Sequence, residues 1–220
     1  MGIINFLNTF IDSSPLFLKA LLLTLSITFC SLLFSLPIGL FFTFLSLTKN
    51  KLLNKVSQTY IYLIRGTPLI VQIFVLYFGL TNIIKLNAFI SASFALAVHN
   101  GAYISEIFRG AINSIGLGQF EASKSLGMTS FKMYRRIILP QTLKRSIPSL
   151  GNQFIITLKD SSLAAFISMD ELFNIATTLG ANTFDQMTYL LIVSIYYLVL
   201  VLLFTLLIRL LEKKFHYAEV

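Results

Sequence analysis

Two adjacent charged residues, Lys159 and Asp160, lie inside an apolar stretch of the sequence. Charged groups at membrane depth are costly, so they usually face the interior of a helix bundle or an aqueous cavity. A neighbouring cation and anion could bind both ends of a zwitterion, and Ser161, Asn152 and Gln153 lie within about two helical turns to add hydrogen bonds. We therefore expect these five residues to line a substrate pathway. The alternative is that Lys159 and Asp160 pair with neighbours and only hold helices together.

A second candidate segment runs from Arg65 to Gln72, where Gly66, Thr67 and Pro68 follow the arginine. Glycine and proline both disfavour regular helix, and irregular backbone at membrane depth is tolerated only where protein or a wet cavity covers it. We therefore expect Arg65, Thr67 and Gln72 to contribute to the same pathway. A simple helix start at Pro68 explains the segment equally well.

Motifs for catalysis, nucleotides and metals are missing from the sequence. It contains no Gly-x4-Gly-Lys-Ser/Thr loop for ATP, no His-Glu-x-x-His, no nucleophile elbow and a single cysteine. The two histidines, His99 and His216, are far apart, so we interpret His99 and its neighbour Asn100 as interhelical hydrogen-bonding groups. We expect no enzyme activity, cofactor or metal, and energy for any transport must come from another subunit or an ion gradient.

The elements that must position these residues are membrane-spanning helices. The chain has 220 residues, 56% of them apolar, and a mean hydropathy of +0.81. Soluble domains rarely reach this level, and several stretches exceed the roughly 20 helical residues that cross a bilayer. We predict an all-α membrane protein that forms a single domain over residues 1–220. Its five spans are expected at residues 20–47, 60–84, 86–108, 147–168 and 187–211.

Charge placement gives the orientation of these spans. The net charge is +8, and most basic residues follow the first, third and fifth spans. By the positive-inside rule, the N-terminus is expected outside and the C-terminus in the cytoplasm. Because the basic residues gather at the ends of apolar segments and not on one face, we do not expect nucleic-acid binding. At the end of the third span, Glu106 and Arg109 are spaced for an i,i+3 ion pair.

The predicted cytoplasmic loop, residues 109–146, contains two short helical patterns. Residues 119–127 are expected to form a helix that ends at Gly127, with Ser114 as an upstream cap. Residues 130–139 form a basic amphipathic pattern that ends at Pro140. Such a helix suits either a lipid surface or a docking site for a soluble partner.

A known family decides between these two interpretations. The positions concerned are Glu121, Ala122, Ser123, Gly127, Ile137, Leu139 and Pro140. Together they resemble the EAA loop of ABC importer permeases, with Ser123 in place of the usual third-position alanine. Residues 64–72, 102–110, 150–154 and 158–163 are similar to segments of the polar amino acid branch, which carries histidine, glutamine, arginine or glutamate.

The resemblance implies a type I ABC importer permease core with cytoplasmic coupling helices, in the bacterial inner membrane. It implies that the EAA-like positions contact separate ATPase subunits that hydrolyse ATP. The other partners it implies are an extracytoplasmic amino-acid-binding protein, a second identical or homologous permease, membrane lipid and a polar amino acid carried by alternating access. The sequence does not specify which amino acid.

Two rival functions explain less of the sequence. An ion-coupled secondary transporter would account for Lys159 and Asp160, but inverted repeats with paired interrupted spans are not visible. An intramembrane enzyme would need a nucleophile and a base on facing spans, and only scattered serines are present.

Overall fold

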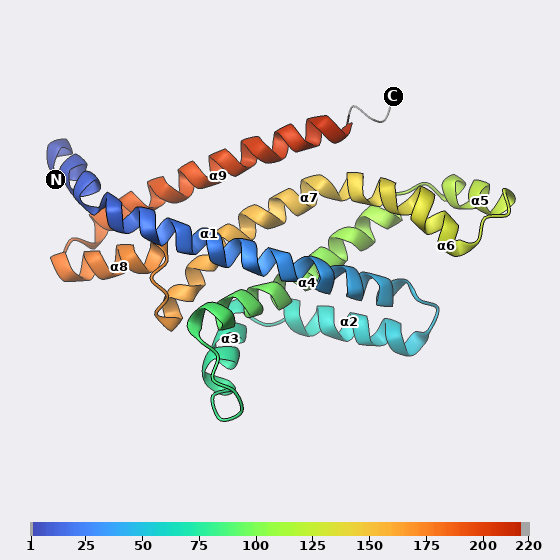
Figure 1. Cartoon of the computed structure of the whole chain (residues 1–220), viewed down its shortest axis with the longest axis horizontal. Helices are drawn as coiled ribbons and strands as arrows, with labels where there is room; N and C mark the ends of the chain where they lie inside the picture. Colours follow the sequence, from blue (N-terminus) through green and yellow to red (C-terminus); the bar gives the residue numbers. More distant parts are fainter. Residues whose placement is uncertain (1, 217–220) are drawn as a thin grey trace.

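Two long apolar helices, α1 (Ile3–Leu47) and α9 (Gln186–His216), run along the length of the computed structural model (Figure 1). The structure describes residues 2–216, and no strand occurs within that range. Between the two long helices lie α2 (Lys51–Arg65), α3 (Leu69–Phe74), α4 (Ala88–Asn113), α5 (Leu117–Ser125), α6 (Ser130–Met133), α7 (Leu139–Asp160) and α8 (Leu172–Thr183). Three further turns are the π-helical η1 (Val75–Gly79) and η2 (Tyr134–Ile138), and the 3-10 helix η3 (Ser161–Ile167).

By length and composition, two helices of the described chain can cross a membrane. These are α1 and the Gln186–Lys214 part of α9. A third crossing is added if α2 and the α3–η1 segment, which meet at an angle of 101°, count as one broken span. The remaining expected spans correspond to α4 and α7, whose sequences are more polar because they pack inside the bundle.

Helix α4 is the central helix of the bundle. More than half of its 26 residues are buried, most of them small or hydroxylated. It crosses α1 closely at Gly39 and Gly101, where an added Cβ would lie 2.5 Å from the Cγ2 of Ile104 and of Ile38, respectively. Small residues at such crossings let helix backbones approach and gain van der Waals contact.

Three apolar clusters stabilise different levels of the molecule. One joins α1, α8 and α9 around Phe17, Leu172 and Ile192. A second joins α1, α3, α4 and η3 in the middle. The third lies under the loop that carries α5 and α6, around Ile115 and Ile138. Figure 1 shows this loop projecting at the opposite end of the molecule from α8.

The first and last expected spans coincide with helices, but α1 is longer than predicted. It begins at Ile3, 17 residues before position 20, and continues without interruption through Pro37. Ser13 and Ser14 did not stop the helix because their hydroxyls donate to the carbonyls of Thr9 and Ile11. Helix α9 contains the whole of the expected span 187–211.

The second expected span, 60–84, is not one helix. Helix α2 already begins at Lys51, where Asn50 accepts hydrogen bonds from the first turn, and it ends at Arg65. Arg65 therefore lies at the end of α2 farthest from the connection to α1, about 20 Å along the helix. After the bend, α3 starts at Leu69 with Pro68 as its N-cap.

The third and fourth expected spans differ from the structure mainly at their boundaries. Helix α4 continues five residues past position 108. Helix α7 begins at Leu139, eight residues before 147, and ends at Asp160, after which η3 covers 161–167. The expected helix end at Pro140 is wrong, because Pro140 occupies the first turn of α7 and η2 joins it to α6. Proline is tolerated there because the first helical N–H groups need no partner.

Candidate functional site

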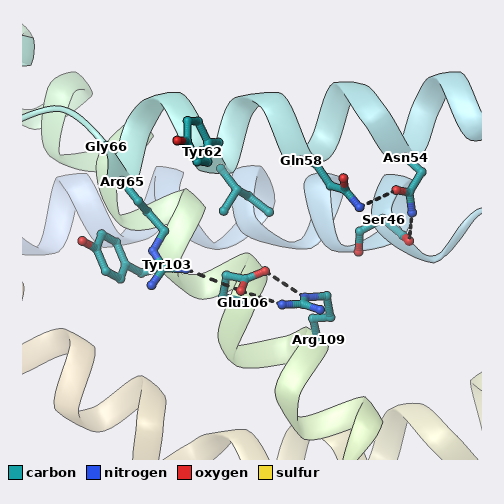
Figure 2. A pocket seen from close by; sticks show the side chains of 10 residues that line it. Ser46, Asn54, Gln58, Tyr62, Arg65, Gly66, Tyr103, Glu106 and Arg109 are labelled. Carbon is teal, nitrogen blue, oxygen red and sulfur yellow. Dashed lines mark hydrogen bonds and ion pairs between the residues drawn. The ribbon is translucent and has the colours of Figure 1, made fainter.

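Two cavities of about 600 Å³ each meet at Arg65, Tyr103 and Glu106. The first lies between α1, α2 and α4 and is also lined by Ser46, Asn54, Gln58, Ile61, Tyr62, Gly66 and Arg109. The second opens between α4 and α7 and is also lined by Ile107, Pro148, Ser149, Asn152, Gln153 and Ile156. Figure 2 shows the Arg65 side chain reaching from the end of α2 toward α4.

Two arginines in this site, Arg109 and Arg65, contact the same carboxylate, Glu106, but only Arg109 does so closely. Arg109 donates two hydrogen bonds to the Glu106 carboxylate, at 2.8 and 2.7 Å, which confirms the expected i,i+3 pair. Arg65 approaches the same carboxylate through one nitrogen only, at 3.5 Å. Its guanidinium carbon also lies 5.0 Å from the centre of the Tyr103 ring (Figure 2), within cation–π range.

The bend between α2 and α3 is stabilised by Gln72 and Thr67. The Gln72 Nε2 donates to the backbone carbonyl of Ile64 at 2.9 Å and to the Thr67 hydroxyl at 2.9 Å. Its Oε1 lies 3.2 Å from Nδ1 of His99 on α4. Carbonyls at a helix end need such partners when they are shielded from water. Arg65 lines both cavities, whereas Thr67 and Gln72 hold the bend beside it. A place for Thr67 and Gln72 on a pathway stays a prediction.

A buried amide pair joins α4 to α7 beside the second cavity. The Gln153 Nε2 donates to the Asn100 Oδ1 at 2.8 Å, and both side chains are almost completely buried. This confirms Asn100 as an interhelical hydrogen-bonding residue. Asn152, one residue before Gln153, is exposed and lines the cavity itself. Of the first candidate set, Asn152 and Gln153 therefore share a site with Arg65.

Lys159, Asp160 and Ser161 lie apart from this site. None of the three lines either cavity, and neither Lys159 nor Asp160 forms a salt bridge with another described residue. Lys159 is exposed seven residues beyond Asn152, hence on the same face of α7 about two turns away. Ser161 is fully buried and donates to the Leu158 carbonyl. A place for Lys159 and Asp160 on a pathway stays a prediction.

The α5 region of the loop has a well-defined helix end. Gly127 adopts a φ of +68°, with the Met128 N–H bonded to the Ser123 carbonyl and the Gly127 N–H bonded to the Lys124 carbonyl. This is the Schellman arrangement, which favours glycine at the left-handed position. The expected helix end at Gly127 agrees with the structure. Ser114 does not cap α5, because it belongs to the end of α4 and its carbonyl accepts from Arg145.

The EAA-like residues divide between the loop core and its surface. Ser123 is buried and donates to the Gln119 carbonyl at 2.6 Å, while Glu121 and Ala122 are exposed. Ile137 packs against the apolar cluster under the loop, and Pro140 is exposed. The exposed apolar side chains around them are Leu117 at 77%, Leu126 at 78% and Phe131 at 72%. Part of this loop is therefore an exposed apolar surface that packs on the apolar cluster around Ile115 and Ile138.

Glu171 is a buried acidic residue that the sequence did not single out. It lies in the connection before α8, accepts hydrogen bonds from the N–H groups of Phe173 and Asn174, and contacts the Tyr197 hydroxyl at 3.1 Å. Its exposed fraction is 0%. Burial raises its pKa to about 7, against the opposing effect of these hydrogen bonds. An acidic residue directly before an apolar helix is an N-cap signal that could have identified it.

This chain is similar to known proteins that belong to one family. The model of the family described as "Binding-protein-dependent transport system inner membrane component" matches residues 35–217. The probable amino-acid permease protein YxeN of Bacillus subtilis is 37% identical over 207 residues, covering 92% of each chain. The glutamine transport system permease protein GlnP of Escherichia coli is 36% identical over 203 residues, covering 91% of this chain and 93% of that protein.

One solved structure is similar over nearly the whole chain. It is described as the crystal structure of an amino acid ABC transporter with histidines. The two chains superpose with a TM-score of 0.90 at 35% identity, which covers 97% of this chain and 100% of the other.

Proposed function

The chain belongs to the family of binding-protein-dependent transport system inner membrane components, and from this premise we propose how it works. It is a permease subunit of an ABC importer for amino acids and has the type I importer fold. Our proposal is that the projecting loop couples the bundle to separate ATPase subunits. The observation that carries the proposal is the exposed surface of Glu121, Leu117 and Leu126 on a loop with its own apolar core.

The loop is connected directly to two helices, α4 and α7, that line a cavity. It leaves α4 on one side and enters α7 on the other through the continuous α6–η2 helix. The same two helices line the cavity that contains Asn152 and Gln153. A movement of the loop relative to the bundle therefore changes the space between α4 and α7. We propose that ATP binding and hydrolysis switch the cavity between outward and inward access, which requires different ATPase affinities in the two states.

The other partners follow from the same family. We propose two ATPase subunits, a second permease copy or homologue, an extracytoplasmic amino-acid-binding protein and a surrounding lipid bilayer. Phe184, between α8 and α9, is 98% exposed at a φ of +55°. A bulky side chain held so unusually at the end opposite the coupling loop supports a contact site for the binding protein there. The orientation we propose has the N-terminus outside and the C-terminus in the cytoplasm.

Charge reversal on the loop surface tests the coupling proposal. Glu121→Lys places a cation at the centre of the proposed interface, whereas Asp12→Lys makes the same change on exposed α1 at the opposite end. We expect Glu121→Lys to weaken binding of the cognate ATPase subunit by tenfold or more, because a reversed charge meets a surface complementary to the original. Binding of the ATPase to surface-immobilised permease in nanodiscs gives this affinity directly.

Asp12→Lys should leave that affinity unchanged. Equal affinity of the wild type and Glu121→Lys for the ATPase would remove α5 from the interface and contradict the proposal.

A further inference from the structure

A third cavity, of about 190 Å³, lies apart from the site around Arg65, at the base of the loop that carries α5 and α6. It is enclosed by the last two turns of α1, the end of α4 and the segment from α6 to the start of α7. We propose that an acyl chain of an anionic phospholipid occupies this cavity, with the headgroup phosphate bound to Arg135. Such a site needs only a chain embedded in a bilayer, so it stands independently of the coupling proposal.

The wall of this cavity offers hydrocarbon to a ligand and few hydrogen-bonding groups. The two threonine hydroxyls in the wall, those of Thr43 and Thr142, already donate to carbonyls one helical turn earlier in the chain. Apolar cavities of about 150 Å³ stay dry and accept small hydrophobic ligands. The cavity therefore favours a hydrocarbon segment over water or a polar solute.

Arg135 gives the cavity a positive edge. Of the described residues that line the cavity, Arg135 alone is charged. Its side chain is exposed and forms no ion pair with another residue of the described chain. Lys132 and Arg136, close to it in the sequence, are exposed as well. A guanidinium in this state can bind phosphate oxygens through paired, charge-assisted hydrogen bonds.

The surrounding sequence has few anions that could neutralise Arg135. Residues 13–159 contain only two acidic side chains, Glu106 and Glu121. Glu106 accepts two short hydrogen bonds from Arg109 and lines the other two cavities, and Glu121 lies on the exposed surface of α5. An anionic ligand therefore complements this part of the molecule, as anionic lipid headgroups complement basic pockets between membrane helices.

The cavity lies at the level where a bilayer changes from hydrocarbon to headgroups. Helix α1 is long and apolar enough to cross a membrane, and it ends at Leu47. Three exposed lysines follow, Lys49, Lys51 and Lys55. Lysines beside the end of a span place their ammonium groups among the headgroups. A lipid at the end of α1 can therefore insert a tail into the cavity while its phosphate stays at the interface beside Arg135.

A tryptophan placed in the cavity can report which lipid occupies it. The chain contains no tryptophan of its own, so a single introduced one gives the whole signal. Phe44 and Phe41 lie on α1 with the same exposed fraction, 56%, but only Phe44 lines the cavity. The full chain carrying Phe44→Trp or Phe41→Trp is reconstituted into phosphatidylcholine vesicles. These contain increasing fractions of phosphatidylglycerol or phosphatidylcholine brominated on the acyl chains, which quench tryptophan on contact.

We expect the anionic lipid to be preferred at the cavity. Half-maximal quenching of Phe44→Trp should require an about fivefold smaller fraction of brominated phosphatidylglycerol than of brominated phosphatidylcholine, because only the former has a net charge to pair with Arg135. Phe41→Trp should be quenched almost equally by the two lipids. Soluble glycerol phosphate, which has the phosphate without an acyl chain, should not relieve the quenching of Phe44→Trp.

Two arginine variants test the headgroup contact in the Phe44→Trp chain. Arg135→Gln should make the two brominated lipids equivalent, because the charged partner of the phosphate is lost. Arg136→Gln removes the same charge from the adjacent exposed position, which does not line the cavity, and should retain the preference. The comparison of the two tryptophans needs no change at Arg135, so it stays decisive even if Arg135→Gln fails to fold.

Equal quenching of Phe44→Trp by both lipids, the same preference at Phe41→Trp, or a preference that Arg135→Gln leaves intact would overturn the proposed lipid site. Relief of quenching by glycerol phosphate would also overturn it, since a phosphate would then bind without an acyl chain. Quenching of Phe44→Trp by neither lipid would show that protein, such as a second copy of this chain, covers the cavity instead.

Discussion

Burial determines the ionisation of Glu171, the most deeply enclosed acidic residue among those described. Its carboxylate caps α8 and contacts Tyr197 on α9, so it links the connection before α8 to the last long helix. Burial destabilises the charged carboxylate more than these hydrogen bonds stabilise it, so the pKa of Glu171 rises to about 7. The residue therefore changes protonation in a range where most carboxylates are fully ionised.

Glu171 makes stability depend on pH in a defined direction. Its folded-state pKa of about 7 exceeds the ordinary value of 4.5, so the folded chain keeps a proton that the unfolded chain has already lost. This contribution, about 3 kcal/mol at most, is fully present below about pH 4.5 and is lost as the pH rises through about 7. We expect Glu171→Gln to raise the unfolding temperature relative to the wild type by several degrees more at pH 7.5 than at pH 5.

Asp170→Asn, at the exposed neighbouring position, should show no such pH-dependent difference. A Glu171→Gln difference that is the same at both pH values would mean that Glu171 is ionised throughout.

Single residues also show what sequence spacing can predict. The Glu106–Arg109 pair was predictable because i,i+3 neighbours meet on any helix. The contact of Arg65 with Glu106 was not, because the two residues are 41 positions apart and meet only through the packing of α2 on α4. Lys159 and Asp160 were grouped with Asn152 because they are near in sequence. Two helical turns separate them from the cavity that Asn152 lines.

At the scale of elements, the helix end at Gly127 gives the coupling loop its shape. The sequence indicated this end because glycine is the residue best suited to a left-handed C-terminal position. An added Cβ at Gly127 would meet no atom within 4 Å, so the cost of a substitution there comes from the backbone conformation alone.

Gly127→Ala should loosen α5 without disturbing the bundle. Alanine at a φ of +68° costs about 1 kcal/mol, which corresponds to about a fivefold larger population of the locally open state and hence faster exchange. Hydrogen–deuterium exchange of the peptide amides of α5 (Leu117–Ser125) measures this change.

Gly118→Ala is the matched control, because Gly118 lies inside α5, has equally open surroundings and has no positive φ. Alanine favours helix there, so its exchange should not accelerate. Equal acceleration by both substitutions would show that the loop is sensitive to any added methyl group and not to the backbone of Gly127.

Helix boundaries depended on contacts that lie outside the local sequence. The polar start of α2 at Lys51 lay outside the predicted spans, but Asn50 caps it and Ser57 donates to the Phe42 carbonyl of α1. The bend after Arg65 was visible in the Gly66 and Pro68 pattern. Its 101° angle was not, because Gln72 and His99 fix it across two helices.

At the scale of the whole molecule, apolar composition and the EAA-like loop were enough to predict the class. Hydropathy alone identifies α1 and α9, whose outer faces expose many large apolar side chains. It misses α4, because a helix surrounded by other helices can bury residues such as Asn100 and Ser105. The apolar stretch 86–108 was nevertheless long enough to be predicted as a span from the sequence. The family resemblance added the fold, and the similar solved structure covers 97% of the chain.

ATP-driven uptake tests the central claim most directly. Proteoliposomes contain this chain, its cognate ATPase and trapped ATP. The binding protein is added outside with radiolabelled glutamine, glutamate, arginine or histidine in separate assays. We predict that at least one amino acid accumulates only when ATP, the ATPase and the binding protein are all present. Glu121→Lys should reduce this accumulation tenfold or more. Accumulation driven by an ion gradient without the ATPase, or undiminished uptake by Glu121→Lys, would contradict the account.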